Sequence, residues 1–168
     1  TASDSQLDLV LTVTNKIAGH NFPTGSSFLR QVWVAVTAKD ATGKVFYISG
    51  DLDDNGDLRN HWSELDPYGD SDLISLSSRF IDAHGNRTLF TWEAVEHTSD
   101  AIEPLLKRTW TLFLPVPKDA QGPLTIEARL HFRAYGPFLL RLLGLSELIK
   151  GFPIWTIDTA KTTVQVTP

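Results

Sequence analysis

A histidine in a short, conformationally restricted segment is the side chain best suited to chemistry in this sequence. The segment runs from Gly19 through His20, Phe22 and Pro23 to Gly25 and leads into an apolar stretch. The two glycines favour a tight turn, because glycine adopts positive φ without a steric penalty. Pro23 fixes its own φ and favours an extended Phe22. A preorganised imidazole suits a metal ligand, and a polar loop residue beside a packed Phe22 is the plainer interpretation.

A second candidate site is an acidic loop that has part of the ligand pattern of a calcium-binding loop. Residues with side-chain oxygens recur at alternate positions, namely Asp51, Asp53, Asn55 and Asp57. Gly56 permits the sharp turn that such loops contain, and Leu58 stands at the position of their apolar anchor. Trp62 occupies the position of the bidentate glutamate. The pattern is consistent with a weak calcium site that braces the loop and with a solvated acidic turn.

The remaining histidines do not form a recognisable catalytic or metal motif. The five histidines are His20, His61, His84, His97 and His131, and no two of them have helical spacing. A hairpin turn is expected to leave one of them, His84, in solvent. Strand ends that converge in a sandwich would allow His20 to share a copper or zinc site with His97 or His131, as in a small metalloenzyme. Nucleophile-elbow and phosphate-loop motifs are absent, so we expect no enzymatic activity.

Composition restricts the class of protein and of partner. The 168 residues are 42% apolar and 21% charged, which is typical of a soluble domain with a proper core. The net charge of −5, with both signs mixed along the chain, argues against nucleic acid as a main partner. No cysteine is present, which excludes disulfides, thiolate metal sites and covalent haem attachment within this chain. Residues 1–4 are interpreted as a processed or trimmed end.

Alternating apolar residues predict an all-β fold. Strands are expected at 7–13, 32–37, 44–49, 74–82, 88–96, 109–116, 124–132 and 156–166. The stretch 50–72 is rich in Asp, Gly, Asn and Pro and is predicted to be a long excursion, which is uncommon unless functional or internally braced. The pattern favours a single immunoglobulin-like β-sandwich domain over residues 1–168.

One segment has helical spacing. Apolar residues in 137–150 recur near a helical period, with Pro137 at the expected first position and Gly151 at the expected end. We predict one short helix near the C-terminus that covers an open end of the sandwich. A partner-docking or membrane-surface helix is the alternative, and it lacks a basic face. The apolar run in 138–145 is broken by Arg141 and is too short to span a bilayer.

The order of these landmarks resembles one protein family. The most specific element is Gly19-His20-Asn21-Phe22-Pro23-Thr24-Gly25. It is followed by Arg30, the strand at 32–36, the turn at 80–86, the segment 114–117 and Leu130-His131-Phe132-Arg133. The pattern runs from about Asn15 to the last strand. It resembles the non-haem β-sandwich domain at the C-terminal side of multihaem c-type cytochromes of bacteria and archaea.

The resemblance implies a role in electron transfer in the periplasm or outside the cell. It implies that His20 is a distal axial ligand to a haem c carried by another segment or chain, with Phe22, Arg30 and Trp33 shaping the contact. Arg30 would pair with a haem propionate or cap a carboxylate of its own strand. The alternative is an immunoglobulin-like binding or adhesion module that recognises a partner through a calcium-braced loop at 50–72.

Overall fold

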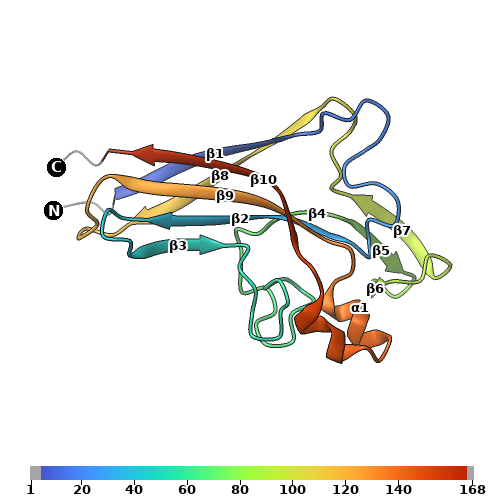
Figure 1. The fold of residues 1–168 in the computed structure, drawn as a ribbon. Helices are drawn as coiled ribbons and strands as arrows, with labels where there is room; N and C mark the ends of the chain where they lie inside the picture. The colour runs from blue at the N-terminus through green and yellow to red at the C-terminus, as the bar shows by residue number, and fades with distance from the viewer. Residues whose placement is uncertain (1–4, 166–168) are drawn as a thin grey trace.

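Strands fill most of the chain, as the alternating apolar patterns predicted. The computed structural model describes residues 5–165 and is an all-β sandwich with a short helix near its C-terminal end (Figure 1). The predicted fold class is confirmed. The predicted processed end at 1–4 and the last residue of the strand predicted at 156–166 lie outside the described residues. No described helix has the length and apolar character that a membrane span requires.

Two antiparallel layers face each other in the sandwich. The larger layer has the order β10 (Trp155–Val164), β9 (Leu124–Arg133), β2 (Gln31–Lys39) and β3 (Val45–Ser49), with β4 (Ile74–Leu76) also paired to β2. The facing layer consists of β1 (Ser5–Thr14) and β8 (Lys107–Val116), which pair along their whole length. The start of β1 and the end of β10 lie at the same end of the sandwich (Figure 1).

The core lies between these two layers. One face of β2 contributes Val34, Val36 and Ala38, which are at most 3% exposed. Leu112 and Leu114 of β8 meet them from the facing layer, and the alternate apolar residues of β1 pack on the same cluster. Alternation along a strand places every second side chain on one face, so these periodic residues are the ones that reach the core.

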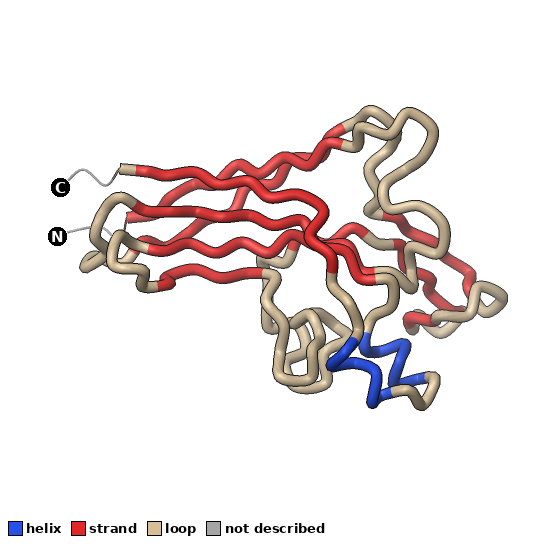
Figure 2. The backbone as a smooth tube through the Cα atoms, viewed as in Figure 1, coloured by secondary structure: helices blue, strands red, loops and turns tan. Residues whose placement is uncertain are grey.

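The long loop at 50–73 leaves and rejoins the same edge of β2. β3 pairs with the second half of β2, at 36–39, and β4 pairs with the first half, at 32–34. The loop between them is the excursion that was predicted at 50–72, and Figure 2 shows it as a folded lobe beside the sheet. A bridge between Leu52 and Leu58 and many turns close it on itself.

The strand predicted at 74–82 is divided between two sheets. Its first part is β4, and its second part is β5 (Ser78–Asp82), which belongs to a three-stranded sheet with β6 (Arg87–Thr88) and β7 (Ala94–Ser99). Ser77 is the point of change, and its carbonyl accepts from the backbone N–H of Asp100 at 2.8 Å. The small sheet is thereby fastened to the end of the sandwich.

The strand predicted at 88–96 is interrupted by a turn. Thr88 Oγ1 donates to the Glu93 carboxylate at 2.8 Å and accepts from the backbone N–H of Phe90 at 3.0 Å. These local side-chain bonds compete with the strand ladder. Phe90 and Trp92 lie in this turn and are 41% and 78% exposed.

The single helix predicted at 137–150 is two short helical segments. α1 (Pro137–Leu142) is an α-helix, and η1 (Ser146–Gly151) is a 3-10 helix. Gly144, with a φ of +72°, separates the two segments. The chain reverses there, and the backbone N–H of Leu145 donates to the carbonyl of Leu140 at 2.8 Å. Pro137 stands at the helix start, as predicted. The first turn of α1 is buried and lies beside the 50–73 loop (Figure 2).

Candidate functional site

The backbone around His20 is pinned to a neighbouring segment. Phe22 and Ile102 form an isolated antiparallel bridge in which each N–H donates to the other's carbonyl at 2.8 Å. The buried Asn15 side chain donates through Nδ2 to the carbonyls of His20, at 2.8 Å, Ile102, at 3.0 Å, and Glu103, at 3.2 Å. The loop is therefore a fixed element rather than a free connection.

The His20 imidazole faces solvent from this fixed backbone. Its residue is exposed, and its ring makes no hydrogen bond or ion pair to any other residue in the range 5–165. A neutral imidazole has one nitrogen lone pair that can bind a metal ion. The loop thus presents a free ligand atom on a rigid support.

Phe22 belongs to the His20 loop, and Arg30 lies close to it. Phe22 is half-buried and packs on the cluster of Val32, Leu76 and Ile102. The Arg30 guanidinium donates to the carbonyl of Thr24 at 2.9 Å. It makes no ion pair with any carboxylate of the described chain, so part of its hydrogen-bonding capacity faces outward.

Trp33 lies inside the fold. Its side chain is 1% exposed, and its indole N–H donates to the carbonyl of Gly50 at 2.9 Å. The His131 ring packs on it with a centroid separation of 5.2 Å, and the Arg133 guanidinium carbon lies 5.6 Å from its ring centroid. Trp33 therefore supports the start of the 50–73 loop and presents no surface to a group bound outside.

The acidic loop uses its oxygens within the protein. Asp53 Oδ1 accepts from the backbone N–H groups of Asn55 and Asp57, each at 2.9 Å. Asp51 pairs with Arg59 at 2.5 Å. Asp57 is fully buried and accepts from Arg141 of α1 at 2.8 Å. Protein donors thus take several of these oxygens, whereas Asp57 Oδ1 is buried without a hydrogen-bond partner among the described residues, and the calcium site stays a prediction.

The other histidines have contacts of their own. His131 is half-buried on β9, where the Thr156 hydroxyl lies 3.2 Å from its Nδ1. The His97 ring packs on Phe80 at 4.9 Å, and His84 is exposed in its turn, as predicted. Within residues 5–165, no group of three or more His, Cys, Asp or Glu side chains is arranged to hold a metal ion.

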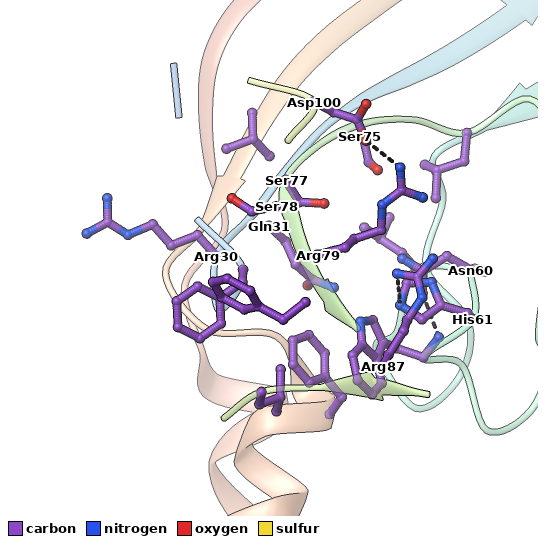
Figure 3. Close-up of a pocket in the computed structure, with 18 of the residues that line it drawn as sticks. Arg30, Gln31, Asn60, His61, Ser75, Ser77, Ser78, Arg79, Arg87 and Asp100 are labelled. Atoms are coloured by element: carbon purple, nitrogen blue, oxygen red, sulfur yellow. Dashed lines mark hydrogen bonds and ion pairs between the residues drawn. The ribbon is translucent and has the colours of Figure 1, made fainter. Parts of the chain in front are cut away.

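A pocket at the junction of the 50–73 loop, the small sheet and α1 was not predicted. It has a volume of about 420 Å³ and is lined by residues of β2, the loop, β4, β5, β6 and α1 (Figure 3). Arg79, Arg87 and His61 provide polar groups, and Trp62 and Phe138 provide aromatic surface. Segments far apart in the sequence build it, so spacing could not reveal it. The predicted long loop was the one signal that pointed there.

Comparison with known proteins identifies a related fold. No family model matches the sequence, and no curated protein matches it significantly. A solved structure of a penta-haem cytochrome c552 from Thermochromatium tepidum superposes with a TM-score of 0.68 and 17% sequence identity. The match covers 98% of this chain and 37% of that chain. The fold is therefore one that occurs within a multihaem cytochrome chain, and this chain spans just over a third of that chain's length.

Proposed function

We propose that this chain is a non-catalytic accessory domain of an electron-transfer assembly, and that it packs against a c-type haem carried by another segment or chain. In this proposal His20 is the distal axial ligand. The observation that carries it is the exposed imidazole, which has no partner among residues 5–165, on a backbone fixed by Asn15 and by the Phe22–Ile102 bridge. A preorganised ligand binds more tightly because little conformational entropy is lost on coordination.

The residues around His20 fit such a role. Phe22 provides apolar surface beside the loop, and Arg30 is free of ion pairs within the described chain. A guanidinium is suited to a carboxylate such as a haem propionate because it forms two parallel hydrogen bonds. The haem, when bound, would supply the one-electron chemistry, and this chain holds and orients the imidazole. The chain has no cysteine, so any thioether-linked haem must be attached elsewhere.

The likeness to a penta-haem cytochrome supports the proposal through the fold alone. Two arguments therefore converge from different sources, namely the local geometry at His20 and the occurrence of this sandwich in a multihaem chain. By the resemblance of its sequence, we propose that the domain works in the periplasm or outside the cell.

A haem peptide tests the ligand role. The probe is a proteolytic fragment of a c-type cytochrome in which one histidine binds the iron and the sixth position is open. Addition of the domain should produce the absorption spectrum of a six-coordinate low-spin haem. His20→Ala should weaken this titration by about tenfold or more, as loss of a positioned ligand does.

The matched control is His84→Ala, because His84 is also an exposed turn histidine. His84→Ala should leave the affinity for the haem peptide within about twofold of wild type, because the proposal gives His84 no role as a ligand. If His20→Ala and His84→Ala have the same effect, His20 is not a specific ligand. A wild-type domain that leaves the haem peptide five-coordinate would also overturn the proposal.

A further inference from the structure

The pocket beneath the small sheet holds an arginine without a carboxylate partner. Arg87 is half-buried on β6, and its side chain makes one hydrogen bond to the described part of the chain, from Nη1 to His61 Nε2 at 2.7 Å (Figure 3). Among residues 5–165, no carboxylate lies within ion-pair distance of Arg87. A partly buried charge that lacks a counter-ion is costly, so the site favours an anion.

His61 does not compensate this charge. Burial, together with Arg87 and Arg79, lowers the pKa of His61 to about 4, so the ring is neutral at physiological pH. Because a guanidinium can only donate, the Nε2 atom of His61 accepts from Arg87. His61 therefore orients the guanidinium and leaves its positive charge in place.

The acidic residues at the rim are engaged elsewhere. Asp100 is shared between Arg79, at 3.4 Å, and Arg108, at 3.5 Å. Asp70 accepts from the backbone N–H of Gly50 at 2.6 Å and from the Ser49 hydroxyl. Asp100 thus serves two guanidiniums, and Arg87 has no carboxylate within ion-pair distance among residues 5–165, so the pocket retains a net positive charge.

The walls around this charge are aromatic. Trp62 stacks on Phe138 with ring centroids 4.4 Å apart, and Phe28 meets Phe80 edge-to-face at 4.8 Å. Rings from both pairs line the pocket. Figure 3 shows Arg79 and Arg87 on its walls, while the Arg30 guanidinium points away from it. Aromatic walls with a few placed polar groups are typical of sites for small organic ligands.

We propose that this pocket binds a small aromatic carboxylate, with the carboxylate against Arg87 and Arg79 and the ring between the aromatic walls. A carboxylate has two oxygens that can accept from the two guanidiniums. Inorganic phosphate has no ring to fill the space between the aromatic walls, so it should bind more weakly. A volume of about 420 Å³ is sufficient for one or two fused rings. Its two proposed ligand groups, Arg79 and Arg87, are not residues of the proposed haem contact at His20, and Arg30 borders both sites.

The test compares 2-naphthoate with its neutral analogue 2-naphthamide, by isothermal titration calorimetry on the full 168-residue chain. The naphthoate should bind with a dissociation constant below about 1 mM, and the amide and inorganic phosphate should each bind about tenfold more weakly or worse. In a ¹H NMR titration the His61 ring signal should shift with naphthoate. Equal binding of acid and amide, or no binding of the acid, would overturn the proposal.

Two variants assign the site. Arg87→Gln and Arg79→Gln should each weaken naphthoate binding, the first by about tenfold or more. The control is Arg129→Gln, since Arg129 on β9 is 54% exposed, pairs with Glu127 and does not line this pocket. If Arg87→Gln fails to fold, Arg79→Gln still tests the proposal. The Arg79 side chain is 40% exposed, so we expect this variant to fold. Unchanged binding in Arg79→Gln and in any folded Arg87→Gln would overturn the proposal.

Discussion

The side-chain amide of Asn15 donates to the backbone carbonyl of His20 at 2.8 Å, and the same amide reaches two carbonyls of the 102–103 segment. One buried side chain therefore joins the end of β1, the His20 loop and the segment before β8. The position of the imidazole depends on a residue that is not itself exposed. This relationship makes the orientation of His20 testable through Asn15.

Asn15→Ala should lower the free energy of unfolding by about 1–3 kcal/mol, because the carbonyls of His20 and Glu103 lose a buried donor. It should also weaken haem-peptide binding, since the ligand is no longer held in place. Urea denaturation measures the first effect. Asn55→Ala is the control, because Asn55 is an exposed loop residue, and it should change stability by less than about 0.5 kcal/mol. Equal stability of both variants would contradict the anchoring role of Asn15.

A buried ion pair fastens the 50–73 loop to α1. The Asp57 side chain is fully buried and accepts from Arg141 at 2.8 Å. Arg141→Leu should cost about 3–5 kcal/mol of stability at neutral pH, because it leaves a buried charge without a partner. The double variant Asp57→Asn with Arg141→Leu should be more stable than Arg141→Leu alone by about 1 kcal/mol or more. Thermal or urea unfolding measures the stability of both variants. A double variant that is less stable than Arg141→Leu would contradict the role of the ion pair.

The same pair predicts a pH dependence. Burial raises the pKa of the Asp57 carboxyl, and Arg141 opposes the rise. A raised carboxyl pKa in the folded state means that the folded state binds the proton more tightly, so stability is lost as the pH increases. Without Arg141, the pKa of Asp57 in the folded state should be raised further. Arg141→Leu should therefore regain stability as the pH falls from 7 to 4, and a loss over that range relative to wild type would contradict the account.

His61 should titrate far below an ordinary histidine. Its pKa is lowered to about 4 by burial and by Arg87 and Arg79. The unfolded chain therefore binds the proton more tightly, and the stability contributed by neutral His61 is lost as the pH falls from about 6.5 to about 4. The NMR chemical shift of the His61 ring against pH measures this directly. Arg87→Gln should raise the pKa of His61, and an unchanged midpoint would contradict the electrostatic explanation.

Gly50 marks the point where the loop leaves the sheet. Its φ is +74°, and a Cβ placed there would lie 2.4 Å from the Val34 carbonyl oxygen. Gly50→Ala should therefore cost about 2–4 kcal/mol, since both strain and a backbone clash arise. Gly43→Ala, at a φ of +87° with no neighbouring atom within 4 Å, should cost only about 1 kcal/mol. Equal losses in a urea titration would show that the clash is relieved at no cost.

Long periodic segments were the part of the fold that could be predicted. The residues of β1, β2, β8 and β9 alternate, and the structure uses that alternation to fill its core. β10 alternates as well, yet nearly all of it is exposed, because it is an edge strand that the two-stranded layer leaves largely uncovered. Alternation indicates a strand, whereas the number of layers over it decides burial.

The site was predictable only where it is local. The His20 loop is contained in seven consecutive residues, so glycine and proline chemistry indicated its rigidity. The acidic residues of the 51–57 segment also stand together, but their partners Arg59 and Arg141 come from outside it. The aromatic pocket depends on contacts such as Trp62 with Phe138, which are 76 positions apart by number and carry no common motif.

The most direct test of the central claim is the NMR spectrum of the domain bound to the ferric haem peptide, with ¹⁵N in the histidine rings of the domain alone. A ring bound to low-spin ferric iron has strongly shifted resonances, whereas unbound rings keep ordinary chemical shifts. We predict one shifted ring, which His20→Ala removes and His84→Ala retains. A shifted ring that survives His20→Ala, or five histidine rings with ordinary shifts, would contradict the account.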